Sequence, residues 1–283
     1  MHINGFPKQQ IKEHKIGIAL SGGGAKGIAH IGVFRALREN GIEPTIVSGT
    51  SAGSIIGALY AAGVPTEDME RLIADSSMMK IFRLFGIPGA GLVKLDYLKE
   101  RLEAFIPENS FESLNYPLYV CATNLNVGKA VYFSTGTVFD KVVASCSVPW
   151  LFKPIEIEGE LYVDGGITNN MPAGIIREQC DILIGSNVKP KVHVQSNKEL
   201  DTFMGITQRV VDLTLWTNSK PHIKMLDVYI APEKVNEFSF FSMSKVKELC
   251  DIGYEETMNQ MPKLLGLIEK QKSQDLISAS ITH

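Results

Sequence analysis

The sequence is poor in cysteine and has no region dominated by charge of one sign. Its four cysteines, Cys121, Cys146, Cys180 and Cys250, form no C-x-x-C pair and match no zinc-binding spacing. A chain of 283 residues can bury an ordinary core, so we expect free thiols in a reducing compartment rather than a disulfide framework. The net charge is -3 and there is no basic run, which argues against a nucleic-acid partner.

Long hydrophobic runs are also missing. No stretch reaches the ~18 consecutive apolar residues that a membrane span needs. Residues 1–15 are polar and lack the apolar centre of a secretory signal. We therefore predict a soluble, cytoplasmic protein, with a peripheral position at a membrane as the alternative. Residues 78–93 are apolar but interrupted by glycine and proline, and we interpret them as a lid or a patch in transient contact with a membrane, or else as a core segment.

The first third of the chain alternates between strand and helix patterns. Apolar, β-branched runs at 15–20 and 44–48 predict buried strands, and helical spacing follows each of them at 29–40 and 52–63. Thr66 can cap a third helix. This order predicts an α/β fold of three layers, α/β/α, with a central and mostly parallel sheet.

The rest of the chain adds elements without a clear boundary. Further strands are predicted at 117–125, 130–136, 155–163, 180–188 and 227–232, and helices at 95–105, 201–226 and 242–270. No repeat or linker interrupts them, so we expect one domain over residues 1–283. Its parts are a motif-bearing core at about 15–190, a C-terminal helical extension at about 200–270 and a loose tail at 271–283.

One serine lies at a corner between a strand and a helix. The segment G-T-S-A-G, residues 49–53, fits G-x-S-x-G, in which a tight turn holds a serine hydroxyl where a carbonyl carbon can reach it. Such a turn needs small neighbours, here Gly49, Ala52 and Gly53. It also places the Ala52 amide and a helix N-terminus beside Ser51, where an oxyanion would form. The alternative is a simple helix cap.

A glycine run, S-G-G-G-A-K-G at 21–27, joins the first strand to the first helix. Gly22, Gly24 and Gly27 match the dinucleotide pattern G-x-G-x-x-G, but no acidic residue closes the second strand as that site requires. A phosphate-binding loop fails because Gly27, not serine or threonine, follows Lys26.

Two interpretations of this run remain. Neighbouring parallel strands end at the same edge of a sheet, so the amides of Gly23 and Gly24 would face Ser51 and form an oxyanion hole. The alternative is a tight turn with no chemical role.

A nucleophilic serine needs a base. In the chain order serine, acid, histidine, only His193, His222 and His283 qualify, and none lies in a motif, so we interpret each as solvated. Asp164 closes an apolar strand and is followed by Gly165 and Gly166. A carboxylate there has room around it, although Asp-Gly is also a common turn.

Together, these motifs resemble the patatin-like phospholipase family. The glycine run, G-T-S-A-G and D-G-G occur in the family's order, and A-S-C-S-V-P-W-L-F at 144–152 resembles its A-S-x-x-P-x-x-F stretch. The resemblance implies a patatin-like variant of the hydrolase architecture. It also implies Ser51 as nucleophile, Asp164 as base without a histidine, and no metal or cofactor. The resemblance implies that the amides of Gly22, Gly23 and Gly24, together with that of Ala52, form the oxyanion hole. The supporting motif residues are Lys26, Gly27, Gly49, Gly53, Gly165 and Gly166.

The chain departs from many family members at two positions. Ser21 stands where they carry aspartate, and Lys26 where they carry arginine. Lysine keeps the positive charge but lacks the planar fork of arginine, which puts a bidentate contact in doubt.

The resemblance predicts a serine hydrolase that cleaves fatty-acyl esters of lipids, of phospholipase A or lysophospholipase type. An acyltransferase or a general carboxylesterase would use the same acyl-enzyme. A module that binds an anion or nucleotide through the glycine run is the non-catalytic alternative. The sequence indicates neither head group nor oligomeric state.

Overall fold

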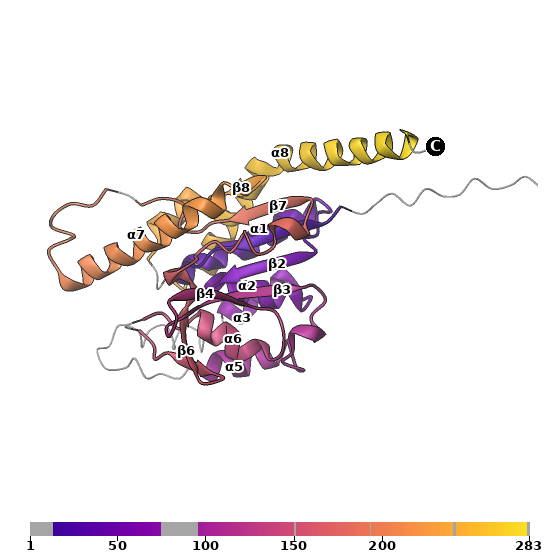
Figure 1. Cartoon of the computed structure of the whole chain (residues 1–283). Helices are drawn as coiled ribbons and strands as arrows, with labels where there is room; N and C mark the ends of the chain where they lie inside the picture. Colours follow the sequence, from indigo (N-terminus) through magenta and orange to yellow (C-terminus); the bar gives the residue numbers. More distant parts are fainter. Residues whose placement is uncertain (1–13, 75–95, 150, 193, 240–241, 282–283) are drawn as a thin grey trace, which may run out of the picture.

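A computed structural model describes residues 14–74, 96–149, 151–192, 194–239 and 242–281 (Figure 1). The apolar segment 78–93, His193 and His283 lie outside the described residues.

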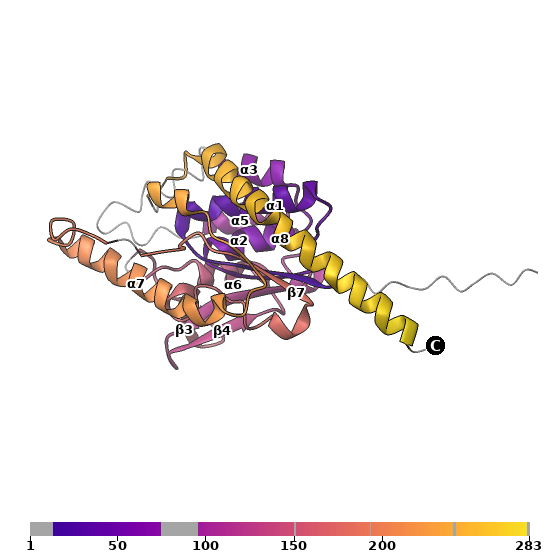
Figure 2. The ribbon, with the colours of Figure 1, turned by 90° about the horizontal axis from the view of Figure 1, so that it is seen from above.

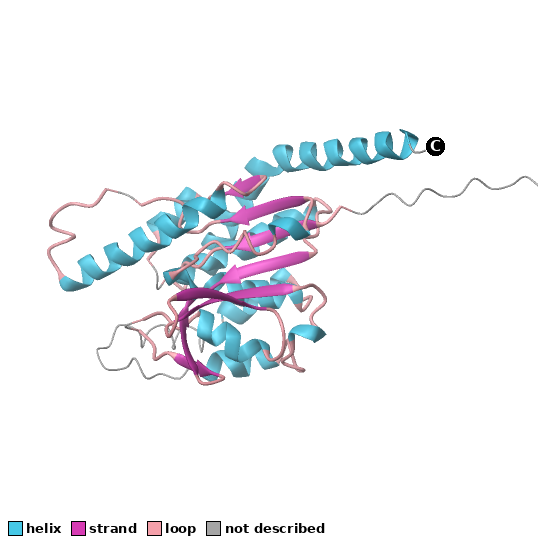
Figure 3. Cartoon of the chain, viewed as in Figure 1, coloured by secondary structure: helices cyan, strands magenta, loops and turns pink. Residues whose placement is uncertain are grey.

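The described residues form one mixed sheet (Figure 3). Its strands are β1 (Ile16–Leu20), β2 (Ile46–Thr50), β3 (Leu118–Asn124), β4 (Lys129–Phe133), β5 (Ile155–Ile157), β6 (Glu160–Asp164), β7 (Ile182–Ser186) and β8 (Val228–Ile230). Strands β3, β2, β1, β7 and β8 run parallel in that order, and β4, β5 and β6 pair antiparallel. The predicted α/β class is confirmed, and β1 and β2 lie side by side as expected.

Seven helices accompany the sheet in the described part of the chain. They are α1 (Ala29–Glu39), α2 (Ala52–Ala61), α3 (Thr66–Ala74), α5 (Asp96–Glu103), α6 (Val138–Ser145), α7 (Phe203–Ile223) and α8 (Val246–Ile281). None of them is both long enough and apolar enough to cross a membrane.

The two faces of the sheet are covered differently. Side chains alternate along β1, so Ile16, Ile18 and Leu20 join the large core formed with α1, α2 and α8. Ala19 points to the other face, into a smaller cluster with residues from the segment 171–176. Figure 2 shows α1, α2, α3 and α8 on one side and α7 on the other.

Helices α1 and α8 pack with their backbones in contact. A Cβ atom on Gly32 would lie 1.8 Å from the Cys250 carbonyl oxygen, and one on Gly253 would lie 1.9 Å from that of Ala29. Only glycine permits so close an approach at both positions.

Helix α8 is longer than the sequence analysis predicted. Residues 271–281 continue the helix instead of forming a loose tail. No glycine or proline follows Gly266 before Ile281, so nothing in the covalent chain ends the helix earlier.

Strands β2 and β6 meet end to end along the same edge of β3. Strand β4 pairs with residues Val120–Asn124 of β3 and so occupies one edge of β3 along these residues. The opposite edge is shared, because β2 pairs with Leu118–Cys121 and β6 with Ala122–Asn124. The carboxyl ends of β2 and β6 therefore face each other, with Thr50 beside Cys121 and Asp164 beside Ala122.

Candidate active site

Ser51 lies in the strained turn that G-x-S-x-G predicts. Its φ is 53° and its ψ is -124°, a combination that non-glycine residues rarely adopt and that costs on the order of 1–3 kcal/mol. The turn is held by close backbone contacts. A Cβ atom on Gly49 would lie 2.4 Å from the Gly53 carbonyl oxygen, and one on Gly53 would lie 2.5 Å from that of Leu20.

Asp164 faces Ser51 from the end of β6. Both residues are buried, with 6% of Asp164 and 8% of Ser51 exposed. The Ser51 side chain lies near enough to the Asp164 carboxyl group to lower its pKa, and the Gly166 N–H donates to Asp164 Oδ1 at 2.7 Å. The head-on meeting of β2 and β6 thus brings together two residues that are far apart in sequence.

Burial controls the protonation of Asp164. Removal from water raises the pKa of its carboxyl group from 3.8 to about 6, while the Ser51 side chain and the hydrogen bond from Gly166 act in the opposite direction. The carboxylate is therefore a stronger proton acceptor than an exposed aspartate and is still ionised at neutral pH.

Ser145 supports the turn and was missed by the sequence analysis. Its Oγ accepts the Ser51 N–H at 2.8 Å and donates to the Cys121 carbonyl oxygen at 2.7 Å. It lies in the A-S-C-S stretch noted above, so the motif was visible, but the sequence does not show which of its atoms meets Ser51.

The glycine run also lies against Ser51. A Cβ atom on Gly22 would be 3.0 Å from the Cβ of Ser51. The Gly22 N–H donates to the Asn170 carbonyl oxygen at 3.3 Å, so this amide is already engaged. Among the described residues, the amides of Gly23, Gly24 and Ala52 have no such acceptor.

Other motif glycines set the contacts of these loops. A Cβ atom on Gly27 would lie 2.4 Å from that of Ala52, and one on Gly165 would lie 2.3 Å from the Cys121 carbonyl oxygen. Gly27 thus lets the first loop approach helix α2, and Gly165 lets the chain turn beside β3 directly after Asp164.

Lys26 points toward the segments that follow β7 and β8. Its Nζ donates to Asn236 Oδ1 at 3.4 Å, and it lines a cavity of about 310 Å³ with Lys189 and Asp212. Burial and then the charge of Lys189 lower the pKa of Lys26 to about 8, with Asp212 opposing them. Lys26 is part of the glycine run, but none of its described contacts is with Ser51.

His30 is a second residue that the sequence analysis did not identify. It is fully buried, and its two ring nitrogens lie 2.8 Å from Ser186 Oγ and 2.9 Å from the Ser21 carbonyl oxygen. Burial lowers the pKa of His30 to about 4, so the ring is neutral at neutral pH. It joins the ends of β1 and β7 just before the glycine run.

The described histidine that a triad would use lies in another environment. His222 Nδ1 accepts the Gly174 N–H at 3.2 Å near the end of α7, and burial lowers the pKa of the ring. His222 is half-buried rather than solvated as expected, because it packs on Gly174.

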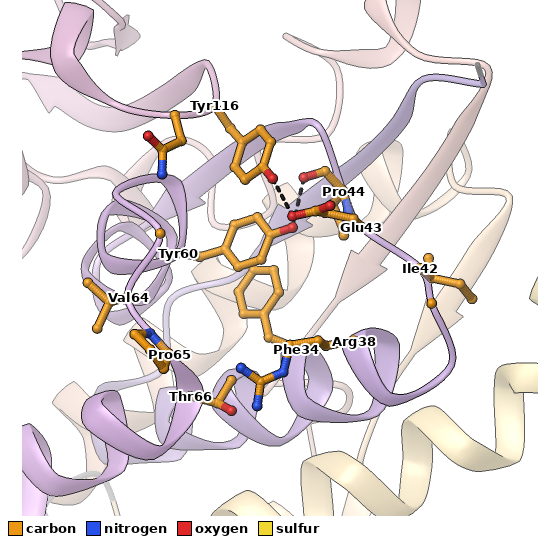
Figure 4. Close-up of a pocket in the computed structure, with 13 residues that line it drawn as sticks. Phe34, Arg38, Ile42, Glu43, Pro44, Tyr60, Val64, Pro65, Thr66 and Tyr116 are labelled. Atoms are coloured by element: carbon orange, nitrogen blue, oxygen red, sulfur yellow. Dashed lines mark hydrogen bonds between the residues drawn. The ribbon is translucent and has the colours of Figure 1, made fainter. Parts of the chain in front are cut away.

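A cavity of about 380 Å³ lies at the opposite end of the sheet (Figure 4). Pro44, which precedes β2, helps to line it, whereas Ser51 follows the other end of that strand. The Phe34 and Tyr60 rings stack in it at 3.9 Å, and the Tyr60 hydroxyl donates to the Pro44 carbonyl oxygen at 2.9 Å. This cavity is therefore separate from the Ser51 site.

Comparison with known proteins agrees with the motifs. The chain is 31% identical over 191 residues to an uncharacterized NTE family protein of Mycobacterium bovis, an alignment that covers 65% of this chain and 53% of the relative. It is 35% identical over 161 residues to lysophospholipase nte1 of Aspergillus fumigatus, covering 55% of this chain and 11% of that protein. The chain thus spans about half the length of the first relative.

Solved structures and a family model extend this result. The crystal structure of VipD from Legionella pneumophila matches with a TM-score of 0.51 and 18% identity, covering 88% of this chain and 66% of VipD, so the two share a fold. The family model described as patatin-like phospholipase matches residues 18–176, more than half of the chain. The chain therefore belongs to the patatin-like phospholipase family.

Proposed function

We propose that this protein is a serine hydrolase that cleaves fatty-acyl esters of lipids with Ser51 and Asp164. The observation that carries the proposal is the meeting of two buried residues, Ser51 in its strained turn after β2 and Asp164 at the facing end of β6. Membership of the patatin-like phospholipase family and the likeness to a protein named lysophospholipase support the substrate class.

The first half of the reaction forms an acyl-enzyme. Asp164 accepts the Ser51 proton while Ser51 Oγ attacks the ester carbonyl carbon. The negative charge that develops on the carbonyl oxygen faces the amides of Gly23, Gly24 and Ala52. When the tetrahedral intermediate collapses, the C–O bond to the leaving alcohol breaks and Asp164 returns its proton to that alcohol.

The second half releases the fatty acid. Asp164 is again a carboxylate and takes a proton from a water molecule, whose oxygen attacks the acyl carbon. The second tetrahedral intermediate expels Ser51 Oγ, which recovers its proton from Asp164. No histidine takes part in this sequence of steps.

Covalent labelling tests the roles of both residues. A fluorophosphonate reagent should label Ser51 in the wild type, and the label should be absent from Ser51→Ala and strongly reduced in Asp164→Asn. Turnover of p-nitrophenyl butyrate should fall by about 10³-fold or more in both variants. His222→Asn is the matched control and should keep most of the wild-type turnover, because His222 packs on Gly174.

Two results would contradict the proposal. Labelling at another serine would remove Ser51 from its role. Loss of turnover in a folded His222→Asn variant would replace the two-residue mechanism with a triad.

A further inference from the structure

Helix α7 exposes an apolar face to solvent. Phe203 is 81% exposed, Ile206 and Val210 are each 53% exposed, and Leu213 is 43% exposed. Their spacing of three, four and three residues places all four on one side of the helix. We call these four side chains the α7 stripe. Figures 1 and 2 both show the N-terminal half of α7 extending beyond the sheet.

The C-terminal half of α7 is fixed to the candidate active site. Asn218 Nδ2 donates to the Gly166 carbonyl oxygen at 2.7 Å, and Asn218 Oδ1 accepts the Asn170 N–H at 3.0 Å. Leu215 packs against Gly166, two residues after Asp164. The helix that carries the exposed stripe thus also holds the loop that directly follows the candidate base, Asp164.

The charges of α7 divide in the same way. Lys220 lies beside the stripe on the helix surface. Asp212, the helix's single acidic residue, lies on the opposite side, where it lines a cavity together with Arg209 and pairs with Lys189 at 2.6 Å. Residues 189–224 contain six lysines or arginines and three acidic residues, although the whole chain has a net charge of -3. This region is therefore positive on a negative protein.

An indole ring lies at the basic edge of the stripe. The Lys220 ammonium group lies 5.4 Å from the centre of the Trp216 ring. Tryptophan and lysine together favour the boundary between lipid and water, because each has an apolar body and a polar end.

We propose that the α7 stripe is a docking surface for an anionic lipid bilayer. The apolar side chains would enter the headgroup region, and Lys220 would meet lipid phosphates. A symmetric contact between two copies fits less well, because it would bring the same basic edges together. The inference builds on the proposed function, since docking would present a lipid surface to Ser51.

Vesicle binding tests this surface. The probe is the full chain carrying Ser51→Ala, which leaves the lipid intact, with vesicles of phosphatidylcholine alone or mixed with phosphatidylglycerol. The double variant I206Q/V210Q should bind the mixed vesicles at least about tenfold more weakly, since two side chains lose apolar burial. The matched control is L276Q/I277Q, which changes two exposed apolar residues on α8 and should bind as the parent does.

Charge and catalysis provide further measurements. Lys220→Gln should weaken binding to mixed vesicles more than to phosphatidylcholine alone. With Ser51 restored, I206Q/V210Q should lose turnover on vesicles while its turnover of p-nitrophenyl butyrate stays within about twofold. That soluble assay reports on the proposed function independently of docking.

Three outcomes would overturn the inference. The first is equal vesicle binding by the parent and I206Q/V210Q. The second is an equal loss in L276Q/I277Q. The third is a dimer in sedimentation analysis that I206Q/V210Q dissociates, which would assign the stripe to contact between copies.

Discussion

At the scale of single residues, the site keeps a carboxylate where folding alone would favour a neutral side chain. Asp164 is only 6% exposed. Lys26, the positively charged residue of the glycine run, donates its hydrogen bond to Asn236 and not to this carboxylate. The carboxylate is stabilised by the Ser51 side chain and by a hydrogen bond from Gly166. These interactions offset only part of the loss of water, so the pKa remains raised.

The raised pKa makes stability depend on pH in a defined direction. Since folding raises the pKa of Asp164 from 3.8 to about 6, the native state binds this proton more tightly than the unfolded state does. The contribution is fully present below about pH 4 and is lost as the pH rises through 6. Ionised Asp164 then costs on the order of 2–3 kcal/mol at pH 8.

We therefore expect Asp164→Asn to be more stable than the wild type at pH 8 by about 1–3 kcal/mol, even though the proposed function requires it to lose activity. The asparagine can still accept the Gly166 N–H. Urea unfolding at pH 8 and pH 4 measures the difference, which should shrink at the lower pH. Asp201→Asn changes an exposed carboxylate and should show no such pattern. The expectation would be contradicted if the gain in the free energy of unfolding from Asp164→Asn were smaller at pH 8 than at pH 4.

At the scale of elements, the contact between α1 and α8 depends on two glycines. Gly32 and Gly253 let the helix backbones touch directly behind the glycine run that faces Ser51. A methyl group at either position meets a carbonyl oxygen rather than a flexible side chain, so one helix would have to move.

Alanine substitutions on α8 separate close packing from helix propensity. Gly253→Ala should lower the free energy of unfolding by about 2–4 kcal/mol because of the clash with Ala29. Gly266→Ala is the matched control on the same helix, where a Cβ atom has no neighbour within 4 Å, and it should raise stability by up to about 1 kcal/mol. Thermal or urea unfolding measures both, and a stabilising Gly253→Ala would show that the two helices are not in contact.

At the scale of the whole molecule, protection of backbone amides from hydrogen exchange should be greatest at the centre of the sheet. All residues of β1, β2 and β7 are buried, whereas the residues of β4 are partly or fully exposed. The N-terminal half of α7 and the end of α8 also carry many exposed side chains. The molecule thus has a rigid centre with two less protected helical extensions.

Hydrogen exchange tests this distribution. Amides of β1, β2 and β7 should exchange only through global unfolding, while those of residues 203–213 and 268–281 should exchange faster by several orders of magnitude. Anionic vesicles should slow exchange in residues 203–213 and leave residues 268–281 unchanged. Uniform exchange across the chain would contradict the expected division.

Much of this architecture could be predicted from the sequence, because the spacing of apolar residues along a strand or helix shows which of its faces is buried. The strands, the helices and the strained serine turn follow from hydrophobic spacing and from glycines at fixed positions. The end-to-end meeting of β2 and β6 could not be predicted, since it depends on which edge of β3 each strand occupies. The contacts of Ser145 and His30 could not be predicted either, because they depend on how the strands are ordered in the sheet. The sequence predicts the helix that carries the α7 stripe. It does not predict that the stripe is exposed, because exposure depends on the tertiary structure.

The contact between α1 and α8 also has a consequence for synthesis on the ribosome. Helix α1 follows the glycine run directly, yet its packing partner is the last described element to leave the exit tunnel. Until residues 246–264 emerge, the apolar side of α1 lacks its cover, and the nascent chain presents that side to chaperones. We expect the geometry of the candidate active site to form only after residues 246–264 have left the ribosome, so a nascent chain that stops before them should lack this site.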